Sequence, residues 1–271
     1  MNFGGLSTAA SIRIPSLHRC IQFSAYPFNS ASHTPYPSPR NLLRMPPSSA
    51  AAAASMTTAS SSSDSLETAD VKKQSHPWLI VGLGNPGKTY SGTRHNVGFE
   101  LVDALAESEG ISMGSVSFKA LFGKGFIGNV PVMLAKPQTF MNLSGQSVGA
   151  IVSYYKIPLK QLLVVYDDMD LPFAKLRMLP KGGHGGHNGM RSIIDHVKGN
   201  RDFPRLRIGI GRPPGKMDGA SYVMRPFSKQ ERQELDFTLQ AGVEAVRILL
   251  LEGFDKSASY ANSPKSLEQL G

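Results

Sequence analysis

A histidine and a carboxylate in this chain have the residue types needed for general base catalysis. His95 lies in an irregular segment after one predicted strand, and Asp167 directly follows another. A carboxylate that is hydrogen-bonded to one imidazole nitrogen fixes the tautomer and makes the other nitrogen a better base for water. Active sites of open α/β sheets lie at the carboxyl ends of strands. We therefore expect Asp167 to orient His95; the alternative is a structural histidine.

Three asparagines, Asn85, Asn142 and Asn188, come at predicted strand-to-helix junctions. An amide donates and accepts hydrogen bonds without adding charge, which suits a peptide chain or an attacking water. The alternative is that each is only a turn residue or a helix cap. Phe140 and Met141 come just before Asn142 and form either an apolar binding wall or a hydrophobic staple.

Two glycine-rich segments are candidates for ligand binding. Residues 82–87 match the dinucleotide fingerprint GxGxxG, but Pro86 and the turn residues after it make the required helix improbable, so a nicotinamide or flavin is not expected. Residues 182–189 (GGHGGHNG) precede a predicted helix and suit an anion or a peptide backbone; the alternative is a mobile surface loop.

Two metal sites are conceivable, and neither is expected. Asp167, Asp168 and Asp170 offer the oxygen ligands that Mg²⁺ prefers. His184 and His187 have HxxH spacing, but a zinc site needs further ligands at suitable positions. We predict no metal and no cofactor.

Hydrophobic periodicity predicts one α/β domain with a mixed, largely parallel twisted sheet flanked by helices. The predicted strands cover residues 78–81, 118–127, 130–135, 161–166, 175–179 and 206–210. The predicted helices lie between 96 and 110, 143 and 155, 190 and 197, and 228 and 250. Asn96 is expected to cap the first of them, and a capping box opens the last.

The chain has 271 residues and a net charge of +9, and its composition changes along its length. Residues 1–63 hold four arginines, fourteen serines and no acidic residue, which is typical of an organelle transit peptide. We expect a linker at 64–76, the catalytic domain at 77–262 and a tail at 263–271. Cys20, the one cysteine, excludes a disulfide framework, and no apolar run is long enough to span a bilayer.

Several motifs together strongly resemble the bacterial-type peptidyl-tRNA hydrolase family. They are VGLGNPG at 81–87, Tyr90, TRHNVG at 93–98, KPQTFMNLSG at 136–145, DDMD at 167–170 and GGHNG at 185–189. Their order and spacing match the family from Trp78 to about Asn262. The resemblance implies hydrolysis, without a metal, of the ester between a peptide and the 3′ ribose of tRNA.

The resemblance also implies roles for individual residues. His95 would be the catalytic base, Asp167 its orienting carboxylate, and Asn85 a residue that adjusts the histidine. Substrate-binding residues would be Tyr90, Phe140, Met141, Asn142, Gly186 and Asn188. Lys181, Arg207 and Lys216 correspond to the family's phosphate-binding region. The residues alone group these three with Arg205 and Arg212 as cations that fit phosphate contacts, and the alternative is solvated surface. Leu179 stands where relatives often carry a cation, so part of the tRNA phosphate binding is absent or is supplied by other residues.

A plastid group II intron splicing factor of land plants has a similar sequence and works with partner proteins on intron RNA. A non-catalytic splicing role is therefore the alternative, although all the residues assigned to chemistry are present here. We expect peptidyl-tRNA as the partner, no membrane and a monomer. The chloroplast is the expected compartment, with the mitochondrion as the alternative.

Overall fold

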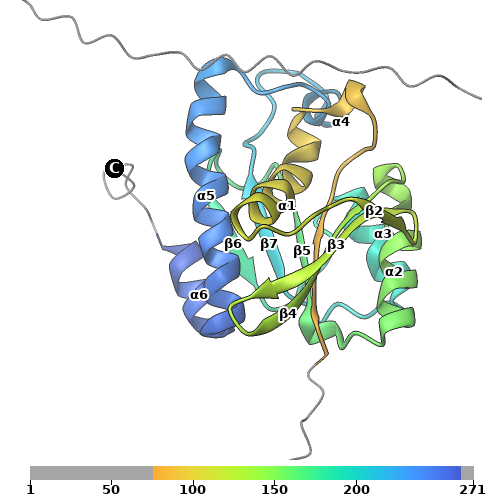
Figure 1. The fold of residues 1–271 in the computed structure, drawn as a ribbon. Coiled ribbons are helices and arrows are strands. Elements are labelled where there is room, and N and C mark those ends of the chain that lie inside the picture. The colour runs from red at the N-terminus through yellow and green to blue at the C-terminus, as the bar shows by residue number, and fades with distance from the viewer. Residues whose placement is uncertain (1–75, 264–271) are drawn as a thin grey trace, which may run out of the picture. The chain divides into compact units, whose positions relative to one another are not determined.

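The computed structural model describes residues 76–263 (Figure 1). The expected transit peptide at 1–63, nearly all of the linker and nearly all of the tail lie outside the described residues. The strands are β1 (Trp78–Gly82), β2 (Ser115–Ser117), β3 (Ala120–Ile127), β4 (Val130–Pro137), β5 (Leu162–Asp168), β6 (Leu176–Leu179) and β7 (Arg205–Gly209). The helices are α1 (Val97–Ser108), α2 (Ser144–Tyr155), α3 (Asn188–His196), α4 (Gly219–Val223), α5 (Lys229–Leu251) and α6 (Phe254–Asn262).

The strands form one mixed sheet in the order β2-β3-β4-β1-β5-β7-β6. Strands β4, β1, β5 and β7 are parallel, and antiparallel strands complete both edges. The predicted fold class is therefore confirmed. The predicted hairpin is also present, because β3 and β4 pair around Gly128, whose φ of 56° suits a tight turn.

Helices cover both faces of the sheet (Figure 1). Leu79 and Val81 of β1 pack into the core beneath α2 and α3, whereas Ile80 packs into the core beneath α1, α5 and α6. This alternation follows from the two-residue period of a strand, and it explains why the strand is apolar throughout. Ser228 and Glu231 form the predicted capping box that begins α5.

Glycines bring α1 unusually close to the centre of the sheet. A Cβ atom on Gly82 would lie 2.2 Å from the carbonyl oxygen of Gly98, and one on Gly98 would lie 2.5 Å from the carbonyl oxygen of Val165. Only hydrogen fits at these two positions, so the first glycine-rich motif serves helix packing. The close approach holds the start of α1, and the residues just before it, against the ends of β1 and β5.

Some local expectations were wrong or incomplete. The Asn96 side chain does not cap α1; its amide instead bonds the backbone N–H and carbonyl of Asn85, at 2.8 and 2.9 Å. The sequence analysis also missed α4 and α6. Asn262 at the end of α6 pairs with the backbone N–H and carbonyl of Met178, which covers the edge strand β6. In the described part of the chain, no helix is long and apolar enough to cross a membrane.

Candidate active site

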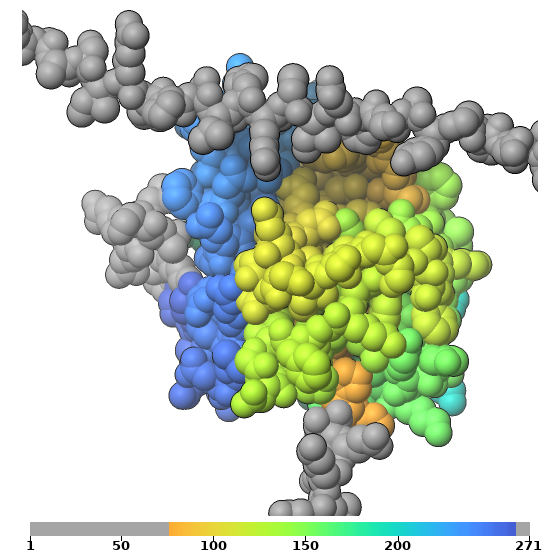
Figure 2. Space-filling view, viewed as in Figure 1, coloured from red at the N-terminus to blue at the C-terminus, as the bar shows by residue number. Residues whose placement is uncertain are grey.

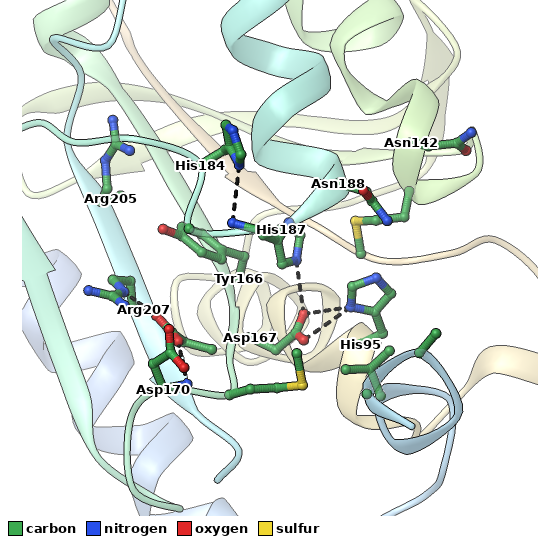
Figure 3. Close-up of a pocket in the computed structure, with 18 of the residues that line it drawn as sticks. His95, Asn142, Tyr166, Asp167, Asp170, His184, His187, Asn188, Arg205 and Arg207 are labelled. Atoms are coloured by element: carbon green, nitrogen blue, oxygen red, sulfur yellow. Dashed lines mark hydrogen bonds and ion pairs between the residues drawn. The ribbon is translucent and has the colours of Figure 1, made fainter. Parts of the chain in front are cut away.

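His95 and Asp167 meet in the folded chain although 72 positions separate them. His95 lies in a 3₁₀ turn, η2 (Arg94–Asn96), and Asp167 lies near the end of β5. The Leu83 N–H donates to the Val165 carbonyl at 2.9 Å, which ties the segment after β1 to β5. Nδ1 of His95 lies 2.9 and 3.0 Å from the two carboxylate oxygens of Asp167 (Figure 3). The predicted juxtaposition is therefore present.

A second histidine, which the sequence analysis considered only for zinc, contacts the same carboxylate. Nε2 of His187 lies 3.1 Å from Oδ1 of Asp167. Nδ1 of His187 accepts the Met190 N–H at 3.3 Å and so caps α3, a role that the sequence analysis weighed for Asn188. Because that N–H can only donate, the ring hydrogen of His187 is on Nε2 and points to Asp167. Asp167 thus accepts from two imidazoles.

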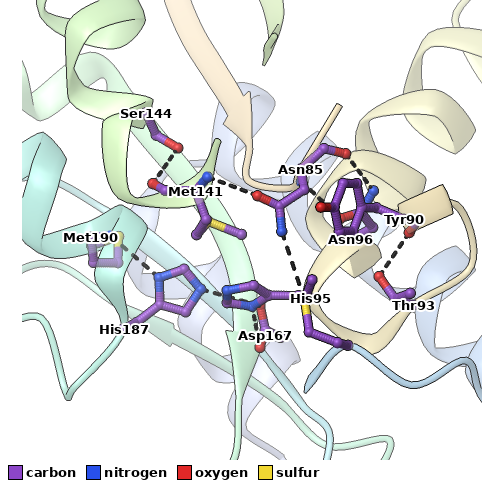
Figure 4. Close-up of polar contacts among 11 residues, drawn as sticks. Asn85, Tyr90, Thr93, His95, Asn96, Met141, Ser144, Asp167, His187 and Met190 are labelled. Atoms are coloured by element: carbon purple, nitrogen blue, oxygen red, sulfur yellow. Dashed lines mark hydrogen bonds and ion pairs between the residues drawn. The ribbon is translucent and has the colours of Figure 1, made fainter. Parts of the chain in front are cut away.

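Asn85 is held firmly beside the histidines (Figure 4). Its Oδ1 accepts the Met141 N–H at 2.8 Å, and its Nδ2 lies 3.9 Å from the sulfur of Met224. The Asn96 amide bonds its backbone, so the side chain and main chain of Asn85 are both fixed. Asn85 therefore joins three segments, the turn after β1, the start of α2 and the segment after α4.

One cavity collects most of the residues that the sequence singled out. His95, Asp167 and Asn85 line it together with the predicted substrate-binding residues Tyr90, Phe140, Met141, Asn142, Gly186 and Asn188. Phe140 is 55% exposed and packs edge-to-face on Tyr90 with 6.3 Å between ring centroids. The Asn142 and Asn188 side chains are exposed, and neither caps a helix. Oδ1 of Asn188 accepts from Nη1 of Arg191 at 3.3 Å, whereas the NH₂ group of Asn188 and the Asn142 amide have no partner among the described residues and can meet a ligand.

A profile of the peptidyl-tRNA hydrolase family matches residues 79–269. The chain belongs to the peptidyl-tRNA hydrolase family. It is 78% identical over 194 residues to the chloroplastic peptidyl-tRNA hydrolase of Arabidopsis thaliana, covering 72% of this chain and 67% of that relative. It is 71% identical over 194 residues to the mitochondrial peptidyl-tRNA hydrolase of Oryza sativa, covering 72% and 78% respectively.

A solved structure supports the same family and fold. The peptidyl-tRNA hydrolase of Acinetobacter baumannii superposes with a TM-score of 0.66 at 37% identity, covering 70% of this chain and 96% of that one. A chloroplastic group IIB intron splicing facilitator of Zea mays is 53% identical over 186 residues, covering 69% of this chain and 73% of that relative. The higher identity to named hydrolases favours the enzyme over the splicing alternative.

The electrostatics of the candidate site follow from the shared carboxylate of Asp167. Burial alone would lower the pKa of His95, but the negative charge of Asp167 and its hydrogen bond raise that pKa above the ordinary 6.5. Burial alone would raise the pKa of Asp167, but the two neighbouring imidazoles hold it well below its ordinary value. Asp167 is therefore an anion throughout the physiological range. Among the described residues, Nε2 of His95 has no hydrogen-bond partner, which leaves it available to a water.

The donor set argues against a resident metal. One atom each from His95, Asp167 and His187 lie within 4.8 Å of one another. However, the Nε2 atom of His187 carries a hydrogen, and a metal ligand must present a free lone pair. The predicted absence of a magnesium site has a similar basis, since Asp168 pairs with Arg207 and Asp170 pairs with Arg212.

The candidate phosphate-binding cations are not all at the cavity. Arg207 lines it and forms an ion pair with Asp168. Lys181 and Lys216 are exposed, and neither is among the lining residues in the described part of the chain. Arg205, grouped with these cations on the basis of the sequence, is only 1% exposed. That grouping was wrong, because its guanidinium donates to the carbonyls of Gly182 and Gly183, at 2.7 and 2.9 Å, and thereby anchors the second glycine-rich loop.

Proposed function

We propose that the chain cleaves the ester between peptide and tRNA by direct attack of a water that His95 deprotonates. The observation that carries this proposal is the 2.9 Å contact between Nδ1 of His95 and Asp167, which directs Nε2 away from the carboxylate. His95 accepts the water proton as the hydroxide adds to the ester carbonyl. It then returns the proton to the 3′ oxygen of the leaving tRNA, so the step needs no external acid or oxidant.

The exposed amides are proposed to hold the peptide and the attacking water. Asn142 and Asn188 lie on the cavity wall and offer donors and acceptors to peptide groups and to the oxyanion. Asn85 positions the His95 region through its fixed amide, and Gly186 presents backbone without a side chain in the way. Tyr90, Phe140 and Met141 supply the apolar wall for the peptide.

We assign tRNA phosphate binding to Arg207, Lys181 and Lys216. Arg207 is the one that lines the cavity, and its partner Asp168 must release it when a phosphate binds. Leu179 also lines the cavity but carries no charge, so the flanking cations have to supply the rest of the attraction.

We further propose that residues 1–63 direct import into the chloroplast, with the mitochondrion as the alternative. The composition of the segment and the chloroplastic and mitochondrial relatives support import into an organelle. A fluorescent fusion of residues 1–76 would distinguish the two organelles. The active form is proposed to be a monomer, because the groups that the mechanism uses line one cavity within the fold.

Release of tRNA from an N-blocked aminoacyl-tRNA by the purified full chain tests the proposal. We expect catalytic turnover that is unchanged by EDTA, with free tRNA and the blocked amino acid as products. A folded chain that binds the substrate but releases no tRNA would contradict the hydrolase mechanism and favour the splicing alternative. Loss of turnover in EDTA, restored by a divalent ion, would contradict the water activation by His95 alone.

The pH dependence of this activity should reflect the raised pKa of His95. Only the neutral imidazole accepts a proton, so the rate rises as pH passes upward through that pKa. Because Asp167 raises the pKa, we expect the acid limb of kcat/KM to have its midpoint above 6.5. Initial rates at fixed ionic strength between about pH 5 and 9 measure it. A profile that is flat from 5 to 8 would exclude His95 as the base.

Changing His187→Asn should separate the capping role of this residue from its contact with Asp167. Asparagine is a good helix N-cap, so α3 stays intact, but its side chain is too short to reach the carboxylate. We expect kcat to fall about ten- to 100-fold, because one hydrogen bond to a charged group contributes about 1.5–3 kcal/mol. Without that hydrogen bond the Asp167 carboxylate stabilises the protonated His95 more strongly and raises its pKa further. The acid limb of the pH profile should therefore move to higher pH.

Thermal unfolding is the control for the His187→Asn result. The asparagine variant should unfold near the wild-type temperature, whereas His187→Ala removes both the cap and the contact and should unfold at a lower temperature. Wild-type kcat together with an unmoved pH profile in His187→Asn would show that the contact with Asp167 has no part in catalysis.

A further inference from the structure

A long stretch of the chain outside the catalytic cavity carries positive charge and no negative charge. Residues 110–166 contain five lysines and not one aspartate or glutamate. Lys136 pairs with Asp103 of α1. In the part of the chain that the structure describes, no ion pair is formed by the other lysines of this stretch, which are Lys119, Lys124, Lys156 and Lys160. All four are exposed.

Aromatic rings gather beside these lysines where the β2–β3 connection meets α2. The ring centroids of Phe118 and Tyr154 are 5.1 Å apart, and those of Tyr154 and Tyr155 are 4.9 Å apart. The ammonium of Lys124 lies 4.6 Å from the centre of the Tyr155 ring. We call Phe118, Lys119, Lys124, Tyr154 and Tyr155 the aromatic–lysine surface. In Figure 2 the yellow-green surface of β2–β4 adjoins the green surface of α2.

The core does not explain why Tyr154 is aromatic. Phe118 and Tyr155 pack against the buried cluster beneath α2, but Tyr154 does not and is 68% exposed. The exposed Tyr154 ring makes its aromatic contacts with the Phe118 and Tyr155 rings and none with the buried core. Large exposed aromatic groups beside unpaired cations are typical of a binding surface. No residue of the aromatic–lysine surface lines the catalytic cavity.

We propose that the aromatic–lysine surface binds single-stranded RNA. Bases stack on the exposed Tyr154 ring and on the half-buried Phe118 ring beside it, and the lysines contact the phosphates that link the bases. The complete lack of carboxylates between residues 110 and 166 complements a polyanion. An acidic peptide would neutralise the lysines but offers no planar group to stack on the exposed Tyr154 ring, so this ring favours a nucleic acid.

Fluorescence anisotropy of a labelled oligouridine of about 12 nucleotides tests the proposal with the full chain. We expect Tyr154→Ala to weaken binding about five- to tenfold and Tyr154→Trp to preserve it, because indole also stacks. We expect Lys124→Ala to reduce the slope of log Kd against log salt concentration by about 0.7.

The matched control is Phe237→Ala, which removes an aromatic side chain that is 45% exposed on α5. It should bind the RNA as the wild type does. Equal affinities of Tyr154→Ala and Phe237→Ala would overturn the proposal. So would displacement of the RNA by an equal concentration of an oligoglutamate peptide, which would assign the surface to an acidic protein. Peptidyl-tRNA hydrolysis by Tyr154→Ala should be unchanged, so failure here and failure of the catalytic mechanism are distinguishable.

Discussion

Changing His95→Ala is expected to lower kcat for peptidyl-tRNA hydrolysis by about 10²- to 10⁴-fold, the usual contribution of a general base. His95 lines the cavity, and its Nε2 has no protein partner among the described residues. Its other nitrogen is held by Asp167 at 2.9 Å. The residual rate should come from the amides that bind the peptide and the oxyanion. KM should change little, because the base acts mainly in the transition state.

His196→Ala is the matched control for this prediction. His196 is an exposed histidine on α3, and it does not line the cavity. Both variants should give wild-type circular dichroism, and His196→Ala should keep the wild-type kcat. If His95→Ala retained more than about a tenth of the wild-type kcat, another group would have to serve as the base.

The meeting of His95 with Asp167 could be predicted because both residues follow strands. The carboxyl ends of neighbouring parallel strands share one edge of a sheet, so Asp167 near the end of β5 and the segment that follows β1 are brought together whatever their separation in sequence. The same reasoning covers Asn85. The branched apolar residues of β5 and the capping box of α5 were also sufficient to locate these two elements. In both, the local sequence pattern and the burial of the apolar residues indicate the same element.

The role of His187 could not be predicted in this way because it depends on a folded loop. His187 reaches Asp167 only because residues 182–187 turn back over the end of β5, and Arg205 anchors that loop from beneath through two carbonyls. A sequence pattern does not distinguish an arginine that binds carbonyls internally from one that faces solvent. The HxxH spacing pointed to zinc, whereas the α3 backbone N–H is what fixes the His187 ring.

Changing Asp167→Asn should be as damaging as loss of the base itself, with kcat about 10³- to 10⁴-fold lower. The carboxylate accepts hydrogen bonds from both His95 and His187. An amide has one oxygen and also presents two N–H donors. Where an N–H faces His95, Nδ1 becomes the acceptor and the ring hydrogen moves to Nε2. The imidazole then points a hydrogen at the water and cannot take its proton.

The pH profile separates this tautomer effect from simple misfolding. Without the anion, burial of His95 is no longer offset, so its pKa should fall below the ordinary 6.5. The small residual activity of Asp167→Asn should therefore persist to lower pH than wild-type activity does. Asp195→Asn, an exposed carboxylate on α3 outside the cavity, is the control and should leave both rate and profile unchanged. If the Asp167→Asn rate were reduced but the acid limb did not move, Asp167 would stabilise the fold and would not set the pKa of His95.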